Sequence, residues 1–465
     1  MVGTVDEDGK PAEILPDEVR GRLDEIGTAD ILVGIPTWNS ERTVAHVATA
    51  VEAGLRKHFP DARSVICVSD GGSTDGTLRA ASRHGLGDQT DLLLVPPSTS
   101  SPDRVCFEYR GTPGKGSAFR SIFEAAVRLD AGACAVVDSD LQSITPAWLD
   151  RLLSPVAHHG FDYVAPVYRR HKYDGTITNS LAYPVTTALY GVRIRQPIGG
   201  EFGFSGAVAK EFAAEEDVWD SDVARFGVDI WMTTMAVGGG HRTCQAILGA
   251  KIHDPKDPGS DLGPMFRQVV GSLFALAGRY RERWWGVDEV LTPPTFGFRA
   301  AFSADPVEVS VARLTWKFVE GYVRHSELWR TVLSPEDMEG VERVVSEASE
   351  RGRLEVGAEL WTRIVYDFLV AYNARTVDTE SLLGSMIPLY FARTATFVEA
   401  TRDDDADQAE AKVQEAADLA IDLKPYLRRR WEEAAVPDRL LHKQPVPDGG
   451  RGSEGLEDAL ATDGP

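Results

Sequence analysis

The chain has 465 residues, 43% of them hydrophobic, which is enough for two or three domains with sizeable cores. Its formal net charge of −22 argues against a partner such as nucleic acid or anionic lipid, because both require clustered Lys and Arg. The four cysteines are widely spaced and form no CxxC pair, which favours buried thiols over metal ligands or disulfides.

Alternating apolar runs and helical periodicities predict a parallel sheet between residues 30 and 165. Strands are expected at 30–36, 64–70, 92–95 and 134–137, and helices at 41–57, 74–84 and 116–130. Strands separated by helices of this length form parallel sheets, and ligands bind beyond the carboxyl ends of their strands. Three of the predicted strands end in polar segments that suit a ligand site: 36-PTWN-39, 70-DGGS-73 and 138-DSD-140.

The sequence pattern changes near residue 300. From 305 to 435, apolar and aromatic residues such as Trp361 and Phe368 recur at helical spacing, which predicts an all-helical region. Residues 1–28 are expected to form a polar lead-in with one short helix, and residues 436–465 a disordered tail. The N-terminus lacks the pattern of a signal peptide, and no apolar run approaches the ~20 residues of a membrane helix. We therefore expect a cytoplasmic protein.

The most informative motif is 138-DSD-140, which directly follows the apolar run 135–137. Two carboxylates so close together repel each other unless a cation lies between them. Mg²⁺ and Mn²⁺ prefer oxygen ligands, and Mg²⁺ is commonly held by one or two carboxylates together with substrate phosphates. The motif therefore predicts a divalent metal that binds a diphosphate, with a solvated turn as the alternative.

Two glycine-containing loops could complete a nucleotide pocket. In 70-DGGSTDGT-77, Asp70 would accept a hydrogen bond from a base or ribose; the alternative is a plain turn from strand to helix. In 113-PGKGSA-118, Lys115 precedes a predicted helix, where a cation can contact an anion. This segment is not a P-loop, because the GxxxxGK[ST] spacing is absent.

These pieces, in this order, resemble the GT-A fold of glycosyltransferases that use nucleotide-sugar donors. Three later segments sharpen the resemblance, toward the retaining enzymes mannosylglycerate synthase and glucosyl-3-phosphoglycerate synthase: 195-RQPIGGEFGFSGAV-208, 226-FGVDIWMTTMAVGGG-240 and 247-ILGAKIHDP-255. The resemblance covers roughly residues 30–280. It implies an α/β, Rossmann-like GT-A domain at 29–300 and an all-helical C-terminal domain at 301–435.

The resemblance also implies site residues. Asp140 and His253 match the family's ligands for Mg²⁺ or Mn²⁺, and Asp138 matches the first carboxylate, which faces the nucleotide or joins the metal. The residues that match the lining of the donor pocket are Pro36, Asn39, Glu41, Asp70, Gly71, Lys115, Asp138 and Ser139. Those that match the acceptor site are Arg170, Thr178, Gly200 and Asp229.

Two of the acceptor residues have a specific expected role and a structural alternative. Arg170 would bind an acceptor carboxylate through its forked guanidinium, or it is a surface charge. Asp229 would orient the acceptor hydroxyl, or it interacts with a helix dipole.

The implied reaction transfers a hexose with retention of configuration, by attack on the face from which the diphosphate leaves. GDP-mannose and UDP-glucose both remain open as donors. Thr176 stands where glucosyl-3-phosphoglycerate synthase has an Arg, and Asp254 and Asp257 follow His253, which favours an unphosphorylated acceptor such as glycerate. Such a product suits a compatible solute. The resemblance further suggests a homodimer.

Other interpretations remain. A phosphorylated acceptor is the first alternative, and a non-catalytic nucleotide-sugar-binding protein is the second. A sugar-1-phosphate nucleotidyltransferase is disfavoured, because its Gly-rich loop after the first strand is replaced here by 36-PTWNSE-41. The segment 98–114 is expected to be a tolerated surface insertion rather than a loop over the donor.

Overall fold

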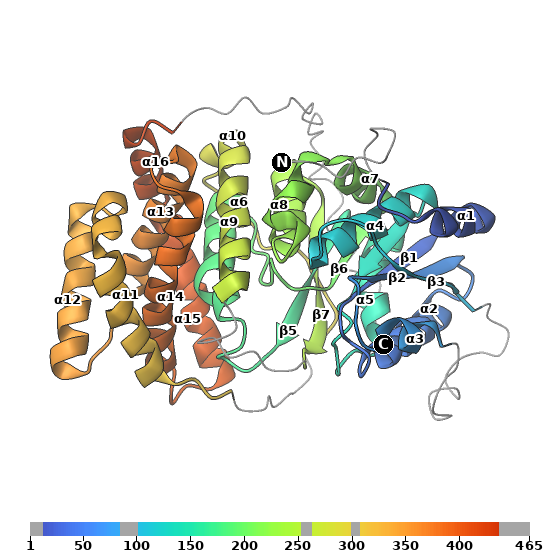
Figure 1. Cartoon of the computed structure of the whole chain (residues 1–465), viewed down its shortest axis with the longest axis horizontal. Helices are drawn as coiled ribbons and strands as arrows, with labels where there is room; N and C mark the ends of the chain where they lie inside the picture. The colour runs from blue at the N-terminus through green and yellow to red at the C-terminus, as the bar shows by residue number, and fades with distance from the viewer. Residues whose placement is uncertain (1–12, 84–100, 253–262, 299–306, 437–465) are drawn as a thin grey trace.

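A computed structural model describes residues 13–83, 101–252, 263–298 and 307–436 (Figure 1). One eight-stranded sheet runs in the order β3-β2-β1-β4-β6-β5-β7-β8. Its strands are β1 (Ile31–Thr37), β2 (Ser64–Asp70), β3 (Asp103–Glu108), β4 (Ala133–Val136), β5 (Tyr163–Arg169), β6 (Phe202–Ser205), β7 (Thr243–Ala250) and β8 (Thr295–Phe296). Every pairing is parallel except the two that β6 makes, with β4 and with β5.

Helices cover both faces of the sheet. Alternate residues of β1 point to opposite faces, so that Ile31 and Val33 pack in one core and Leu32 in the other. The helices of this part are α1 (Asp17–Ile26), α2 (Val44–His58), α3 (Thr77–Ser82), α4 (Lys115–Arg128), α5 (Pro146–His159), α6 (Tyr183–Tyr190), α7 (Gly206–Ala214), α8 (Val228–Gly239), α9 (Gly263–Arg279) and α10 (Arg281–Trp285). A π-helical turn, η2 (Thr178–Ala182), precedes α6, and two 3-10 turns, η3 (Asp217–Asp220) and η4 (Asp222–Ala224), precede α8.

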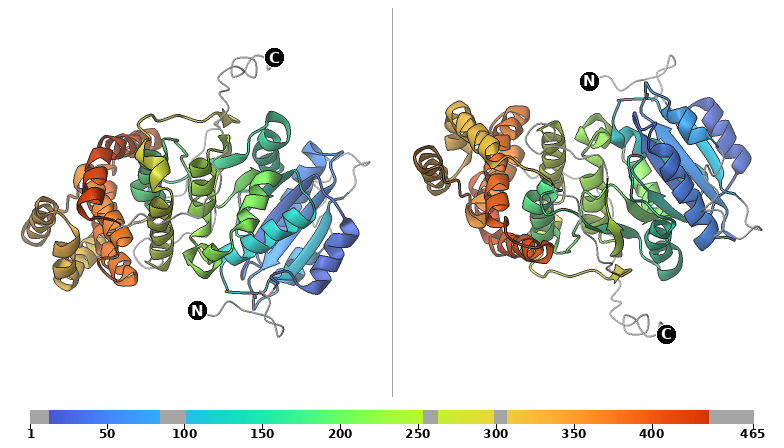
Figure 2. Two further views of the ribbon diagram at one scale, coloured as in Figure 1. Left: turned by 90° about the horizontal axis from the view of Figure 1, so that it is seen from above. Right: turned by 90° about the horizontal axis from the view of Figure 1, so that it is seen from below.

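The C-terminal part is helical and lies at the opposite end of the molecule from β1, β2 and β3 (Figures 1 and 2). Its helices are α11 (Val311–Val332), α12 (Pro335–Arg351), α13 (Ala358–Ala374), α14 (Thr379–Ala400), α15 (Ala406–Asp422) and α16 (Lys424–Glu433). Its core is continuous with the core on one face of the sheet. Helix α9 joins the two, because the Asn373 side chain of α13 donates a 2.9 Å hydrogen bond to the carbonyl of Phe274.

The predicted α/β sheet followed by a helical region is confirmed. The strands expected at 30–36, 64–70 and 134–137 are present within one residue, as β1, β2 and β4. The strand expected at 92–95 and the tail at 437–465 lie outside the described residues. Across the described ranges, no helix is long and apolar enough to cross a membrane.

The prediction of a surface insertion at 98–114 is wrong for residues 103–108, which form β3. Val105 and Phe107 are buried, and the strand pairs with β2 in parallel register. Their side chains alternate with that of Cys106, which is only partly buried, as in a strand whose two faces are unequally covered. Gly and Pro on both sides of this short run made the whole segment resemble a loop.

Candidate active site

The residues singled out in the sequence gather at one edge of the sheet. Because β1, β2 and β4 are neighbours and parallel, their carboxyl ends bring Asn39, Asp70 and Asp138 to the same edge. Strands β5 and β7 are also parallel to each other, and they add Arg170 and Lys251 just beyond their last residues.

Strand β6 reaches the same edge of the sheet with its amino end. It is antiparallel to β4, with Val136 opposite Phe202, so the residues that precede β6 lie beside those that follow β4. Gly200 and Glu201 therefore reach Asp138 even though the chain runs in the opposite direction. One reversed strand thus adds a carboxylate to an edge that a fully parallel sheet would not have supplied.

Five charged side chains meet at this edge, and we refer to them as the edge cluster. Asp138 bridges two lysines: its Oδ1 lies 2.8 Å from Nζ of Lys115, and its Oδ2 lies 3.0 Å from Nζ of Lys251. Lys115 also lies 3.1 Å from Oδ1 of Asp229, and Lys251 lies 2.8 Å from Oε1 of Glu201. Three carboxyl groups therefore contact two ammonium groups.

Local packing explains the glycines on both sides of Lys115. A Cβ atom on Gly116 would lie 1.8 Å from the carbonyl oxygen of Val223, and one on Gly114 would lie 2.3 Å from that of Ala224. The backbone at the start of α4 can approach η4 only without side chains at these two positions. This contact places Lys115 opposite Asp229, in the first turn of α8.

Gly200 is required for a similar reason. Its φ of +92° is in the region that favours glycine, and a Cβ atom there would lie 2.3 Å from Oδ2 of Asp138 and 2.8 Å from Nζ of Lys251. The predicted acceptor residue Gly200 therefore makes room for the contact between Asp138 and Lys251. No side-chain chemistry of its own is involved.

The carboxyl groups of the edge cluster differ in how easily they bind a proton. Burial by itself would raise the pKa of Asp138, but Lys115 and Lys251 hold it well below its usual range. Burial raises the pKa of Asp229, and raises that of Glu201 well above its usual value, against the opposing effect of the lysines. Burial would lower the pKa of each lysine, but the neighbouring carboxylates outweigh it and raise both. Asp138 is thus the permanent anion, while Asp229 and Glu201 protonate more easily.

Asp70 connects the end of β1 to the loop after β2 through hydrogen bonds. It is 1% exposed, and its carboxylate accepts hydrogen bonds from Thr37 Oγ1 at 2.7 Å, from Ser73 Oγ at 2.7 Å and from Ser73 N at 2.8 Å. These bonds tie the end of β1 to the loop after β2. A Cβ atom on the neighbouring Gly71 would lie 3.5 Å from Cδ1 of Trp38, so the Trp38 ring lies beside this loop.

The other predicted donor residues connect the same loops. Asn39, at a φ of +48°, accepts a 2.9 Å hydrogen bond from Thr74 N through its side-chain oxygen. Ser139 bonds Ser40 through their hydroxyls at 2.8 Å. Glu41 lies against the backbone of Gly76, since a Cβ there would be 2.2 Å from its Oε1. Pro36 lies within the buried strand β1, just before the polar residues that follow the strand.

The predicted acceptor residues do not all face the edge cluster. Arg170 lies with its guanidinium carbon 4.8 Å from the ring centre of Tyr168, and one of its Nη atoms is 3.8 Å from Asp174. Its Nε is buried without a hydrogen-bond partner among the described atoms, so it can still donate to a ligand. Thr178 is 2% exposed, in the first position of η2, and contributes to packing there.

The donor set for a metal is partly visible. Asp138 and Asp140 follow β4 and offer carboxylate oxygens, which suit Mg²⁺ or Mn²⁺. His253, the third expected ligand, lies outside the described residues, as do Asp254 and Asp257. Within the described ranges no group of three His, Cys, Asp or Glu side chains is placed to hold a metal ion. The two aspartates fit such an ion chemically, although Asp138 already has a lysine on each of its oxygens.

Glu201, Lys251, Tyr168 and Trp38 were not among the predicted site residues. Glu201 is 0% exposed and accepts a hydrogen bond from the Tyr168 hydroxyl, beside its contact with Lys251. Trp38 is 69% exposed at the end of β1. The available signals were a Glu directly after two glycines, a Lys directly after the apolar run 246–250, and a Trp in a polar loop.

The sheet, its strand order and the charged edge define a GT-A glycosyltransferase domain. Residues 32–212, which run from β1 to α7, match the model of the family described as Glycosyl transferase family 2. The match indicates a glycosyltransferase domain between β1 and α7, and a helical region follows the sheet. None of the curated proteins matches the sequence significantly.

Several solved structures resemble the chain over a little more than half its length. Glucosyl-3-phosphoglycerate synthase from Mycobacterium tuberculosis with Mg²⁺ and UDP is 23% identical, covers 57% of this chain and 86% of its own, and has a TM-score of 0.41. The same enzyme with Mn²⁺, UDP-glucose and phosphoglyceric acid is 23% identical, covers 57% and 85%, and has a TM-score of 0.40. A mycobacterial protein is 23% identical, covers 57% and 80%, and has a TM-score of 0.39. A likeness of this degree does not extend to substrates.

Proposed function

We propose that this glycosyltransferase uses a divalent metal and transfers a hexose, with retention of configuration, from a nucleoside-diphosphate sugar to a small hydroxy acid such as glycerate. The observation that carries the proposal is the position of Asp138. It lies at the end of β4, beside the loop after β1, and is held as an anion by Lys115 and Lys251.

The donor side of the proposal is supported by the loops after β1 and β2. They are tied together by Asp70, and the exposed Trp38 lies beside them. An aromatic ring that is open to solvent at a strand end offers a stacking surface for a nucleobase. The diphosphate would then lie over Lys115 and the two aspartates that follow β4. GDP-mannose and UDP-glucose both suit this arrangement.

A bound Mg²⁺ or Mn²⁺, held by Asp140 with Asp138 nearby, would neutralise charge on the departing diphosphate. The chain's own residues orient the two substrates. Lys115 adds positive charge where the diphosphate leaves, and Asp229 accepts a hydrogen bond from the acceptor hydroxyl. Glu201 is too deeply buried to touch a substrate, so it positions Lys251.

Retention is explained by attack on one face of the sugar. The acceptor oxygen forms a bond to the anomeric carbon on the same side from which the diphosphate oxygen leaves. The bond between that carbon and the diphosphate breaks, and the acceptor proton passes to the leaving phosphate oxygen. This route requires no protein nucleophile. It asks the chain only to hold the acceptor close and to stabilise negative charge on the leaving group.

An unphosphorylated acceptor is favoured by two features. Arg170 can bind a carboxylate through its unpartnered Nε, which matches a hydroxy acid. Thr176 is 3% exposed and its hydroxyl is 2.5 Å from that of Tyr390, so the position that would face an acceptor phosphate is a neutral contact with α14. A glycosylated hydroxy acid would suit a role as a compatible solute.

The first test is a thermal-shift panel with UDP, GDP, UDP-glucose and GDP-mannose, each with Mn²⁺ or with EDTA. A ligand at 100 times its dissociation constant adds about 2.7 kcal/mol to the free energy of unfolding. We expect one nucleotide family to raise the Tm only with metal, and Asp140→Ala to abolish that rise. Asp61→Ala, an exposed carboxylate at the other end of the sheet, is the matched control and keeps it.

The second test compares D-glycerate with 3-phosphoglycerate as acceptor, by release of nucleoside diphosphate. We expect a higher kcat/KM for D-glycerate, and a loss of that preference in Arg170→Gln. A strong preference for the phosphorylated acceptor would contradict the proposed acceptor but leave the transfer reaction in place. Binding of a nucleotide sugar with no product formed would instead identify a nucleotide-sugar-binding protein.

A further inference from the structure

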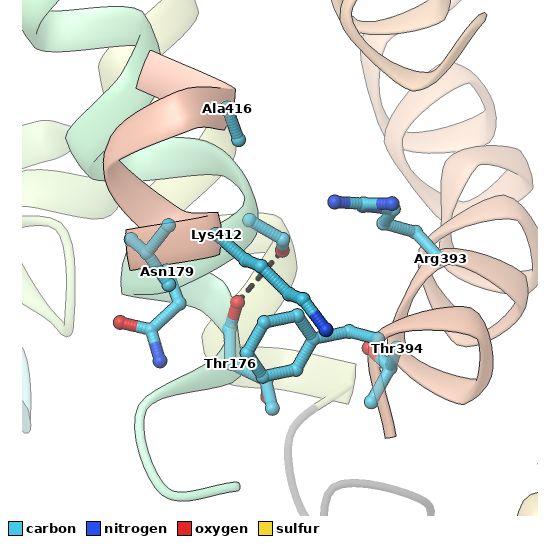
Figure 3. Close-up of a pocket in the computed structure, with 9 residues that line it drawn as sticks. Thr176, Asn179, Arg393, Thr394, Lys412 and Ala416 are labelled. Carbon is cyan, nitrogen blue, oxygen red and sulfur yellow. Dashed lines mark hydrogen bonds between the residues drawn. The ribbon is translucent and has the colours of Figure 1, made fainter. Parts of the chain in front are cut away.

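A small pocket lies between the GT-A domain and the helical region, where η2 faces α14 and α15 (Figure 3). It has about 310 Å³ of empty space when its open mouth is included. Its lining residues are Thr176, Asn179, Ser180, Arg393, Thr394, Phe397, Lys412, Val413 and Ala416. None of them belongs to the edge cluster, so the pocket is separate from the candidate active site.

Two cations reach into this pocket from different helices. Arg393 extends from α14 toward α15, and Lys412 extends from α15 toward α14 (Figure 3). Lys412 already has partners, because its Nζ lies 2.7 Å from Oδ2 of Asp404 and 2.6 Å from the carbonyl oxygen of Ala400. The charge of Lys412 is therefore balanced within the protein.

A second ion pair next to the pocket is also balanced. Arg195 binds Glu410 in a forked arrangement, with distances of 2.8 Å and 2.7 Å, and donates a further hydrogen bond to Asn179 Oδ1 at 2.8 Å. Asn179 is thus fixed with its oxygen toward Arg195. Its amide nitrogen has only a long 3.5 Å contact, to the carbonyl of Asp174, and is available as a donor.

Among the charged side chains around the pocket, Arg393 is the one that has no carboxylate partner in the described part of the chain. Among the described residues its one hydrogen bond is a 3.0 Å bond from Nη1 to the carbonyl of Val356, and its Nε is buried without a partner. No carboxylate of the described chain pairs with it. Burial lowers the pKa of Arg393 to about 10, so it remains charged near neutral pH. A buried charge without a counter-charge is costly, and an anion from solution would relieve that cost.

We propose that this pocket binds an oxyanion, the phosphate or carboxylate group of a small molecule, through Arg393, with Lys412 and the Asn179 amide at its sides. The guanidinium supplies the forked donor that oxyanions favour, and the pocket mouth leaves the rest of the molecule in solvent. The inference does not depend on the proposed transfer reaction.

Binding there would join two parts of the protein. The pocket contains Thr176, which contacts Tyr390 of α14, and the same segment of chain begins with Arg170 at the candidate acceptor site. A Cβ on Gly175, between them, would lie 3.5 Å from Nη1 of Arg170. An anion that holds η2 against α14 would therefore also restrict the segment that carries Arg170.

The test measures the Tm of the full chain in inorganic phosphate, in acetate and in sodium chloride at equal ionic strength, with EDTA present. We expect phosphate or acetate to raise the Tm by at least about 2 °C over chloride. A response to phosphate alone identifies a tetrahedral ligand, and a response to acetate as well identifies a general carboxylate site. Equal Tm values in all three salts would overturn the proposal.

Variants of the pocket residues test whether the anion binds in this pocket. Arg393→Gln should weaken the anion effect by about 10- to 100-fold in apparent affinity, since a charge-assisted hydrogen bond is lost. Arg324→Gln, a 66% exposed arginine side chain on α11, is the matched control and keeps it. If Arg393→Gln does not fold, Lys412→Gln replaces it and should weaken the effect as well, because one of the two cations that line the pocket is then lost. An anion effect that survives either pocket variant belongs to another site and overturns the proposal.

Discussion

Two buried groups of charged side chains differ in how their charges are matched. The edge cluster has three carboxyl groups in contact with two lysines. The second group, here called the helix cluster, lies between α12, α13 and α16. It consists of Asp337, Asp367, Arg363, Arg430 and Tyr426.

Every acid of the helix cluster has a cation of its own. Asp367 lies 2.7 Å from Nε of Arg430 and 2.8 Å from the hydroxyl of Tyr426, and it accepts a 2.8 Å hydrogen bond from Ser334 N. Asp337 lies 2.8 Å from Nε of Arg363. Both guanidinium groups also reach exposed carboxylates, Arg363 that of Glu336 and Arg430 that of Glu433, so neither cation is left for a ligand. Such a group specifies how helices pack.

The edge cluster is built differently. It lies at strand ends, its charges are not matched one to one, and burial raises the pKa of Asp229 and Glu201. The comparison teaches that burial of charge alone does not mark an active site. Position at the carboxyl ends of strands, with an excess of one sign, is the distinguishing feature.

The largest effect on stability is expected for Asp367→Ala in the helix cluster. Removing this carboxylate takes away the acceptor of the Ser334 amide and the nearest counter-charge of Arg430, which should lower the free energy of unfolding by about 3–5 kcal/mol. Urea unfolding measures the loss. Transfer activity per folded molecule should not change. Glu355→Ala, which breaks a surface pair with Arg353, is the control and should cost less than about 1 kcal/mol.

Asp138→Asn should show the opposite pattern. We expect kcat/KM for transfer to fall by about 100- to 1000-fold, as when one electrostatic contact in a catalytic site is lost. The loss of stability should be smaller than in Asp367→Ala, because Asp229 and Glu201 still provide an anion beside each lysine. Steady-state kinetics and urea unfolding on the same sample test both parts. If the variant is unstable but fully active, Asp138 has a structural role like that of the helix-cluster carboxylates and no role in transfer.

A buried cation that contacts no carboxylate among the described residues extends the comparison to pH. Lys424 is 3% exposed and donates to the carbonyls of Leu189 at 3.3 Å and Val287 at 2.5 Å. Burial lowers its pKa from 10.5 to about 8, with Arg428 nearby adding to the effect and Asp288 opposing it.

The sign of the pH effect follows from this direction. Between pH 8 and 10.5 the unfolded chain keeps a proton on Lys424 that the folded protein has lost, so the free energy of unfolding rises with pH there. The rise is at most about 3 kcal/mol. Urea unfolding of the wild type and Lys424→Met across this range isolates the contribution. Parallel curves for the two proteins would contradict the assignment.

The smallest predicted effect concerns Trp38, at the solvent side of the edge. If its ring stacks on the nucleobase, Trp38→Ala should raise the KM for the donor by about 10-fold, with a smaller change in kcat. Trp316→Ala on α11 removes another exposed ring, 62% exposed against 69% for Trp38, and should leave both constants unchanged. Equal kinetics for the two variants would remove Trp38 from the donor site.

Local patterns in the sequence were sufficient for the strands and their ends. The apolar runs that became β1, β2 and β4 are continuous, because strands covered by helices on both faces are apolar on both faces. The polar residues that follow them could be assigned to one edge, since parallel neighbouring strands share a carboxyl end. The short strand β3 was missed because its apolar run is only three residues long and lies close to Gly and Pro residues.

The partners of the charged residues were decided by the tertiary structure. Asp138 meets Lys115 and Lys251 because α4 packs against η4 and because β7 ends at the same edge. Glu201 joins them only because β6 is antiparallel to β4, and strand direction is set by the whole sheet. A local sequence pattern states that a charge is present, but not which distant charge will face it.

The contacts between the GT-A domain and the helical region follow the same rule. Thr176 meets Tyr390 although 214 positions separate them in the chain. Arg393 appears in the sequence as one residue of an ordinary helix, and only the packing of η2, α14 and α15 leaves its charge buried. The sequence by itself thus determined the elements and their polar ends. The tertiary structure decided which charges are paired, because electrostatic interactions act through space and not along the chain.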